Sequence, residues 1–197
     1  MISKDYKTFF YLSFAMAIIV IISNYLVQFP INYYGLQNLL TYGAFTYPIT
    51  FLITDLSNRS YGKDAAKKVV YVGFICGVLI TLFISTNFSD LISVRIAIGS
   101  GTAFLIAQII DIHLFDRLRN YKNWIVAPLT SSLFGSTIDT FLFFFIAFYN
   151  TGISWVSLAL GDFLVKVFIA MIMLIPFRIL LSKMKNISDK KVSYKVK

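Results

Sequence analysis

The chain has 197 residues, of which 58% are hydrophobic and only 14% are charged, with a mean hydropathy of +0.76. Soluble domains are about half apolar and about a quarter charged, so this composition excludes a soluble globular domain. The 20 Phe and 12 Tyr residues also exclude a disordered chain. A lone cysteine, Cys76, and a lone histidine, His113, exclude an internal disulfide and a His/Cys metal cluster.

Six segments are long and apolar enough to cross a bilayer, which takes roughly 20 mostly apolar residues. In chain order they are Thr8–Phe29, Leu36–Leu56, Val69–Phe88, Leu91–Phe115, Trp124–Tyr149 and Ile153–Leu181. The second contains Gly43 and Pro48, which predict a kink or a break. We therefore expect an all-α integral membrane protein: a single bundle of six transmembrane helices over residues 1–182, followed by a basic cytoplasmic tail over residues 183–197.

The basic residues are concentrated on one side of the predicted membrane. Sixteen Lys and Arg residues flank the side that carries both termini, whereas Arg95 alone flanks the other side. Because positively charged loops face the cytoplasm, both termini are expected to be cytoplasmic. The net charge of +9 then reflects topology and contact with the lipid bilayer, and nucleic acid is not needed to explain it.

Five ionisable residues fall inside the predicted spans: Asp55, Asp111, Asp139, Asp162 and Lys166. A charge at the bilayer centre costs about 2.5–3.5 kcal/mol on insertion scales, so such residues are functional candidates. At a rise of about 1.5 Å per residue, the first three descend stepwise from the cytoplasmic face toward the lysine. Asp162 and Lys166 are four residues apart, which favours a structural ion pair within one helix, or a gate.

Other polar residues on these spans extend the candidate site. Gln108 lies on the same helix face as Asp111, and Asn24 and Gln28 form a polar face near the outer end of the first helix. Hydrogen bonding between helices is the structural alternative for these amides. His113 is a candidate for proton coupling, with contact to lipid headgroups or a neighbouring helix as the alternative.

Carboxylates and amides in an aromatic-rich cavity suit a flat polar heterocycle. An ionised carboxylate accepts the two parallel N–H bonds that a guanine-like edge offers. An intramembrane aspartyl protease fits poorly, because the stretch Ala159-Leu-Gly-Asp162 lacks the first glycine of such a motif. The sequence also has no phosphate-binding loop, nucleophile elbow or zinc signature, so we expect no catalytic residues, no metal and no cofactor.

Several stretches, in order, carry a family resemblance: Asn24-Tyr-Leu-Val-Gln28, Gly43-Ala-Phe-Thr-Tyr-Pro48, Phe51-Leu-Ile-Thr-Asp55, Ala107-Gln-Ile-Ile-Asp111-Ile-His113, Ser132-Leu-Phe-Gly135, Asp139-Thr140, and Asp162 with Lys166. Together they resemble the bacterial queuosine precursor transporter family, six-helix proteins of the cell inner membrane. The chain departs from the wider family at Ala107, where a serine is common, and at Ala127, where an arginine is common.

The resemblance implies uptake of 7-cyano-7-deazaguanine, with 7-aminomethyl-7-deazaguanine as a second candidate substrate, for tRNA modification. The expected substrate-binding residues are Asp55, Gln108, Asp111, Asp139, Lys166, Asn24 and Gln28. Our hypothesis assigns Asp139 to the amidine edge of the ligand, and Asp55 and Asp111 to a cytoplasmic gate. The alternatives are the substrate-binding subunit of an ATPase-energised vitamin importer, a non-transporting scaffold and an intramembrane enzyme. Proton coupling, sodium coupling and facilitated diffusion all stay open, as does the oligomeric state.

Overall fold

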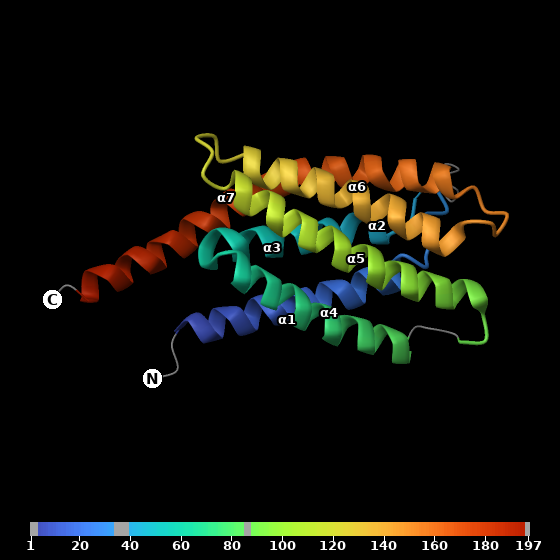
Figure 1. The fold of residues 1–197 in the computed structure, drawn as a ribbon, viewed down its shortest axis with the longest axis horizontal. Helices are drawn as coiled ribbons and strands as arrows, with labels where there is room; N and C mark the ends of the chain where they lie inside the picture. Colours follow the sequence, from blue (N-terminus) through green and yellow to red (C-terminus); the bar gives the residue numbers. More distant parts are fainter. Residues whose placement is uncertain (1–3, 34–39, 85–87, 196–197) are drawn as a thin grey trace.

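The computed structural model describes residues 4–33, 40–84 and 88–195, and within them the secondary structure is helical apart from one isolated β-bridge. The helices are α1 (Lys4–Leu26), α2 (Gly43–Thr46), α3 (Pro48–Tyr61), α4 (Lys63–Ile84), α5 (Leu91–Leu118), α6 (Val126–Phe148) and α7 (Trp155–Lys195). The start of α1 and the end of α7 lie at the same end of the bundle (Figure 1).

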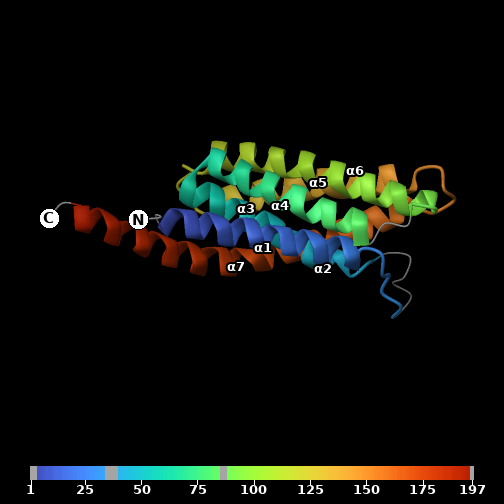
Figure 2. The ribbon, with the colours of Figure 1, turned by 90° about the horizontal axis from the view of Figure 1, so that it is seen from below.

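The short helix α3 lies at the centre of this bundle. It has only 14 residues, yet it packs against α1, α4, α5, α6 and α7. The longer helices surround it, with α5 beside α6 and α1 beside α4 (Figures 1 and 2). Side chains on α3 can therefore reach several helices at once.

The distribution of side chains is that of a membrane protein. The stretches Lys7–Leu26, Leu91–Leu118, Val126–Phe148 and Trp155–Ser182 are each long and apolar enough to cross a membrane. Large apolar side chains point outward, while Asp, Lys, Asn, Gln, Ser and Thr side chains fill much of the interior. This arrangement satisfies polar groups inside the protein and leaves apolar surface for lipid. The prediction of an all-α membrane protein is confirmed.

The second predicted span differs most from expectation. Residues 36–39 lie outside the described residues, and residues 40–42 are not helical, because their backbone pairs with residues 29–31 through bonds of 3.0 and 3.1 Å. The prediction of helix at residues 40–42 was therefore wrong. Helix forms only from Gly43, makes one turn as α2, and restarts at Pro48 as α3. The break that these two residues predict is present.

Two glycines on α4 allow it to pack closely against α1. A Cβ atom on Gly73 would lie 2.3 Å from Cγ of Met16, and one on Gly77 would lie 2.7 Å from Cγ1 of Val20. Neither distance is possible for real side chains, so only glycine permits this approach. Small residues four apart are typical of helix contacts in membranes, where close packing replaces the hydrophobic effect.

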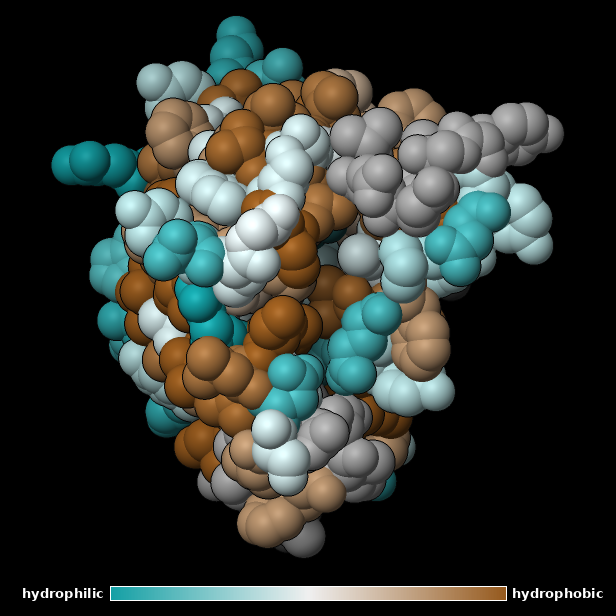
Figure 3. Space-filling view, turned by 90° about the vertical axis from the view of Figure 1, so that its right-hand side faces the viewer, coloured by the Kyte–Doolittle hydropathy of each residue, from teal (hydrophilic) through white to brown (hydrophobic). Residues whose placement is uncertain are grey.

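Arg95 ties α5 to α6 at the end of the bundle opposite the termini. Its Nε donates to the carbonyl of Ile146 at 2.9 Å, and its Nη2 donates to the carbonyl of Tyr149 at 2.8 Å. Carbonyls at the end of a helix lack helical partners, so the guanidinium caps α6. This end shows polar and apolar side chains intermixed (Figure 3).

Helix α7 runs for 41 residues and contains Pro176. Proline lacks the backbone N–H and commonly kinks a helix, and the C-terminal part of α7 bends away from the bundle (Figure 1). The part beyond Ser182 covers the residues expected to form the basic tail, and there the backbone continues as helix.

Candidate functional site

Buried polar residues form two groups inside the bundle. The first, which we call the lysine cluster, consists of Asp139 and Thr140 on α6 with Asp162 and Lys166 on α7. The second, which we call the aspartate pair, consists of Asp55 on α3 and Asp111 on α5. The structure therefore divides the predicted acids between two places.

The lysine cluster joins α6 to α7 through one ammonium group. Nζ of Lys166 lies 2.8 Å from Oδ2 of Asp139 and 2.7 Å from Oδ2 of Asp162. It also donates to Oγ1 of Thr140 at 3.1 Å, and that hydroxyl donates to Asp162 at 2.9 Å. All four side chains are buried, so each formal charge within the cluster meets an opposite charge inside the protein.

Tyr47 connects the lysine cluster to two further helices. Nζ of Lys166 lies 5.1 Å from the centre of the Tyr47 ring, within the range of a cation–π contact. The Tyr47 hydroxyl donates to Oδ1 of Asn24 at 2.6 Å and lies 2.7 Å from the hydroxyl of Ser100. The Ser100 hydroxyl in turn donates to Oδ1 of Asn24 at 2.5 Å. The break between α2 and α3 thus puts a tyrosine in contact with α1, α5 and α7.

The aspartate pair has no such cation. Oδ1 of Asp55 accepts from Ser131 at 3.4 Å and Oδ2 accepts from Ser132 at 3.3 Å, both of which are long hydrogen bonds. Neither oxygen of Asp111 has a hydrogen-bond partner among the described residues. Gly135 brings α6 close to this point, since a Cβ atom there would lie 3.3 Å from Cβ of Asp111.

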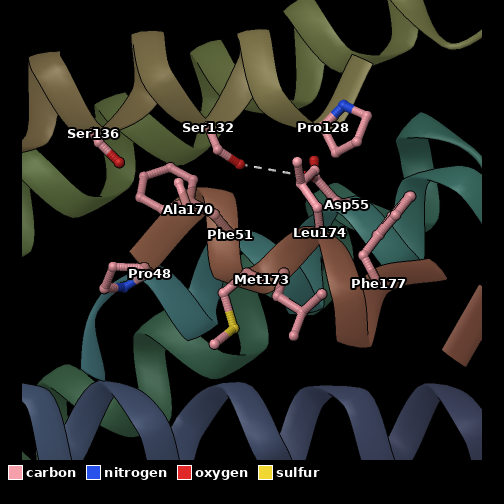
Figure 4. A pocket seen from close by; sticks show the side chains of 11 residues that line it. Pro48, Phe51, Asp55, Pro128, Ser132, Ser136, Ala170, Met173, Leu174 and Phe177 are labelled. Atoms are coloured by element: carbon pink, nitrogen blue, oxygen red, sulfur yellow. Dashed lines mark hydrogen bonds between the residues drawn. The ribbon is translucent and has the colours of Figure 1, made fainter. Parts of the chain in front are cut away.

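A narrow cavity lies beside the aspartate pair, between α3, α6 and α7. Its polar lining consists of Asp55, Ser132 and Ser136, and Phe51 and Phe177 are among its apolar walls (Figure 4). The Ser136 hydroxyl has no hydrogen-bond partner among the described residues. The empty space is about 310 Å³ with its open mouth included, and room inside the walls suffices for about one water molecule. A larger guest requires these helices to separate.

A second cavity of about 260 Å³, again with open space included, lies at the lysine cluster. Asp139, Asp162, Lys166, Tyr47, Ser100, Val27 and Phe143 line it. The two cavities are neighbours: Tyr47 precedes Pro48 of the first cavity, Asp139 follows Ser136 by one turn, and Lys166 precedes Ala170 by one turn. They lie one above the other along α6 and α7.

The remaining predicted residues lie outside these contacts with the acids. Gln108 is fully buried between α5 and α3, where its Oε1 accepts from Thr54 at 2.6 Å and its Nε2 donates to Thr50 at 2.9 Å. Gln28 is exposed and donates to the backbone carbonyl of Asn24 at 3.4 Å. His113 is exposed, and its Nδ1 lies 2.7 Å from the Ile109 carbonyl of its own helix.

Several polar residues at the site escaped sequence reasoning. They are Tyr47, Ser100, Ser131, Ser132, Ser136 and Thr140. Hydroxyls are common in membrane helices, where they also bond to their own backbone, so their presence alone carries little information. The usable signal is the spacing of the small residues Ser131, Ser132, Gly135 and Ser136 at i, i+1, i+4 and i+5, which marks a closely packed face of α6. Within the described residues, no three His, Cys, Asp or Glu side chains converge on a metal site.

The chain is similar to proteins of one family. Residues 41–181 match the family model described as "Putative vitamin uptake transporter". The "Queuosine precursor transporter" of Escherichia coli K12 is 36% identical over 208 residues, which cover 95% of this chain and 93% of that protein. The "Probable queuosine precursor transporter" of Haemophilus influenzae is 36% identical over 86% of this chain and 84% of its own length, and that of Bacillus subtilis is 27% identical over 68% of each. No solved structure matches the chain.

Proposed function

Because the chain belongs to the vitamin uptake transporter family, which consists of transporters rather than enzymes, we propose that it imports a queuosine precursor across the bacterial inner membrane. The proposed substrate is 7-cyano-7-deazaguanine, with 7-aminomethyl-7-deazaguanine as a possible second one. The names of the relatives support the substrate class. The choice of 7-cyano-7-deazaguanine as the first substrate is our own proposal; the guanine-like edge that both compounds share suits the Asp55 carboxylate, which lines a cavity with aromatic walls.

The proposed topology has six membrane crossings with both termini in the cytoplasm. It is supported by the position of both chain ends at one end of the bundle and by the basic residues concentrated there. In this arrangement α2 and α3 together form the second crossing. Helix α3 alone rises only about 21 Å, at about 1.5 Å per residue, against a hydrocarbon core of about 30 Å. Non-helical backbone at this depth is tolerated because it is enclosed by protein.

The proposed route runs through the two stacked cavities. The cavity at the lysine cluster is nearer the end with Arg95, and the cavity at Asp55 is nearer the end with both termini. The Lys166–Asp139 ion pair lies between them and forms part of the barrier. Both cavities are narrow in this conformation, as expected of a carrier that opens to one side at a time.

We assign the amidine edge of the substrate to Asp55 rather than to Asp139. The carboxylate of Asp139 already binds an ammonium group, whereas Asp55 holds only two long hydrogen bonds from serines and lines a cavity. Ser132 and Ser136 supply further polar contacts, and Phe51 supplies an aromatic wall (Figure 4). The observation that carries the proposal is this uncommitted carboxylate beside an aromatic ring, in a chain of this family.

The test is uptake in bacteria that cannot make the precursor, with queuosine in tRNA as the readout. Hydrogen bonds to a charged group contribute about 1.5–3 kcal/mol, so Asp55→Asn should raise the precursor concentration needed for half-maximal tRNA modification by roughly 10- to 150-fold. The matched control is Asp116→Asn, which changes a partly exposed acid paired with Arg119. Equal precursor requirements in Asp55→Asn and wild type, at equal protein levels, would contradict the assignment.

Uptake into liposomes that contain only this protein separates a self-sufficient carrier from the subunit of an ATPase-energised importer. A carrier equilibrates labelled 7-cyano-7-deazaguanine across the membrane without any partner. A subunit that depends on an ATPase leaves the internal concentration unchanged. Protein-free liposomes provide the baseline.

A further inference from the structure

Two buried acids share one region of the bundle without an ion-pair partner among the described residues. Asp55 and Asp111 are 2% and 0% exposed, and both lie against the same stretch of α6: Ser131 and Ser132 bond to Asp55, and a Cβ atom on Gly135 would lie 3.3 Å from Cβ of Asp111. The ion pairs of the described residues join Arg119 to Asp116 and Lys166 to Asp139 and Asp162, so none of them involves this pair.

The surrounding basic groups are committed elsewhere or lie apart. On α3, Arg59 follows Asp55 by one turn, but its guanidinium bonds to the carbonyl of Arg119. On α7, Lys166 binds two other acids and Arg178 lies over the ring of Trp124, 4.9 Å from its centre. On α5, the exposed His113 bonds to its own helix and Asp116 pairs with Arg119.

The two other neighbouring helices add no charge to the pair. Helix α6 has no titratable side chain from Val126 to Ile138, and its next one, Asp139, belongs to the lysine cluster. The basic residues at the start of α4, Lys63, Lys67 and Lys68, take part in none of the ion pairs of the described residues. Within the part of the chain that the structure describes, the aspartate pair thus has no ion pair that balances its negative charge.

Unpartnered oxygens gather at the same place. Both oxygens of Asp111 lack a hydrogen-bond partner among the described residues, and so does Oδ1 of Asn58, which is fully buried. Asn58 lies one turn after Asp55 on α3, and its Nδ2 donates at 2.9 Å to the carbonyl of Ile112, the residue that follows Asp111 on α5. Orphaned buried oxygens are costly, and oxygen ligands are what a small cation takes.

The cost of two adjacent charges indicates what is missing. Two like charges side by side repel strongly at the effective dielectric constant of a protein interior, and removing each carboxylate from water carries a further cost. One positive charge between them removes the repulsion and supplies a partner for the orphaned oxygens. We propose that Asp55 and Asp111, with Asn58, Ser131 and Ser132, bind a single monovalent cation, H⁺ or Na⁺.

The site is placed to couple this cation to the substrate, a step that rests on the proposed function. Asp55 lines the cavity between α3, α6 and α7, whereas Asp111 lies behind it on α5. A cation held mainly by Asp111 changes the net charge of the pair from −2 to −1 and leaves Asp55 ionised toward the cavity. Each ligand then changes the affinity for the other by the same factor.

The cation site is tested on the purified full chain, without substrate. Melting is followed from pH 5.5 to 8.5, with NaCl against N-methyl-D-glucamine chloride at constant ionic strength. Wild type should melt higher in acid if the ion is H⁺, or higher with Na⁺ at pH 8.5 if it is Na⁺, since a ligand of the folded state stabilises it. Asp111→Asn, which resembles the protonated acid, should lose this dependence, while Asp116→Asn should keep it. The same dependence in wild type and Asp111→Asn would overturn the proposal.

A second measurement on wild type covers the case in which Asp111→Asn fails to fold. Dicyclohexylcarbodiimide, an apolar reagent, modifies protonated carboxyls in apolar surroundings, and mass spectrometry of peptides finds the modified residue. Labelling at Asp55 or Asp111 should fall as pH rises for a proton site, or fall with Na⁺ at fixed pH for a sodium site. No labelling of the pair, or labelling that ignores both pH and Na⁺, would overturn the proposal.

Coupling is tested separately in liposomes with an imposed pH or Na⁺ gradient. Accumulation of labelled precursor above the outside concentration, driven by one of the gradients and lost in Asp111→Asn, is the expected result. If the precursor only equilibrates across the membrane, and neither gradient changes its final internal concentration, the coupling step is overturned. If wild type takes up no precursor at all, the proposed function fails, while the melting and labelling results still decide whether the cation site exists.

Discussion

The lysine cluster and the aspartate pair meet the same problem, which is how to bury two acids in a membrane protein. In the lysine cluster, Lys166 reaches both carboxylates and Thr140 bridges them, so the chain provides its own compensation. In the aspartate pair, two serines make long bonds to Asp55 and nothing described bonds to Asp111. Within the described residues, each charged group of the first arrangement has an ionic partner, although its two acids outnumber its one lysine, whereas neither acid of the second has one.

This difference assigns different work to the two regions. Ion pairs between helices hold them at a fixed distance, so the lysine cluster fixes α6 against α7. Acids without an ionic partner gain stability when a ligand arrives, so the aspartate pair is the place where binding can change the packing of α3. Substitutions in either region test this difference, and their expected effects on stability or uptake differ in size.

The largest effect is expected from Lys166→Met. Removing one partner of a buried pair leaves uncompensated charge and typically costs about 3–5 kcal/mol. We expect little folded protein in the membrane, measured by fluorescence-detected size exclusion and by melting. The triple variant Lys166→Met, Asp139→Asn, Asp162→Asn removes all the charges together and should recover folding. If Lys166→Met melts at the same temperature as wild type, the lysine cluster does not stabilise the contact between α6 and α7.

A smaller effect is expected from Gly135→Ala, beside the aspartate pair. The added Cβ atom would lie 2.5 Å from Cε1 of Phe51, which is buried, so the ring or α6 must move. Overpacking of this kind costs about 1–3 kcal/mol. The matched control is Gly101→Ala, where the nearest atom lies 3.6 Å away. Gly135→Ala should melt at a lower temperature than Gly101→Ala, and equal melting temperatures would mean that α6 can move away from Phe51 at little cost.

A loss of about 1 kcal/mol is expected from Gln108→Met, because it removes two hydrogen bonds while both hydroxyl partners keep backbone bonds of their own. The half-saturating precursor concentration should stay as in wild type, since Gln108 is bonded to α3 on both sides of its amide. A changed precursor requirement with unchanged melting would return this residue to the substrate site, where its sequence position first placed it.

The smallest effect is expected from His113→Gln. The side chain is exposed and bonds only to its own helix among the described contacts, and such changes usually shift stability by less than about 0.5 kcal/mol. Uptake driven by a pH gradient should be unchanged, in contrast to Asp111→Asn. Loss of proton-driven uptake in this variant would move the coupling site from the aspartate pair to the surface of α5.

The sequence predicts contacts within one helix much better than contacts between helices. The spacing of Asp162 and Lys166 points to an ion pair, and the structure has one. That Asp139 joins the same ammonium group, 27 residues away on α6, depends on which faces of α6 and α7 meet. Helix α7 is apolar on nearly all sides where it crosses the membrane, so its sequence contains no stripe that marks the inward face.

Depth along a helix was likewise an incomplete guide to position. Counting residues places Asp55, Asp111 and Asp139 on one descending line, but Gly135 and the short α3 bring the first two together on one side of α6. The partners of Gln108 show the same limit. Thr50 and Thr54 share a face of α3, yet only the packing of α3 against α5 puts that face opposite the glutamine.

The bend in α7 has a mechanical consequence for the wall of the cavity. Pro176 has no N–H to offer, so the carbonyl four residues earlier already lacks its helical partner there. The next side chain, Phe177, closes the cavity and packs against Phe115 and Trp124. Movement of the part of α7 after Pro176 would separate Phe177 and Leu181 from the apolar cluster that they form with Leu56, Phe115 and Ala127, so this wall of the cavity moves only together with the packing of α3, α5 and α6.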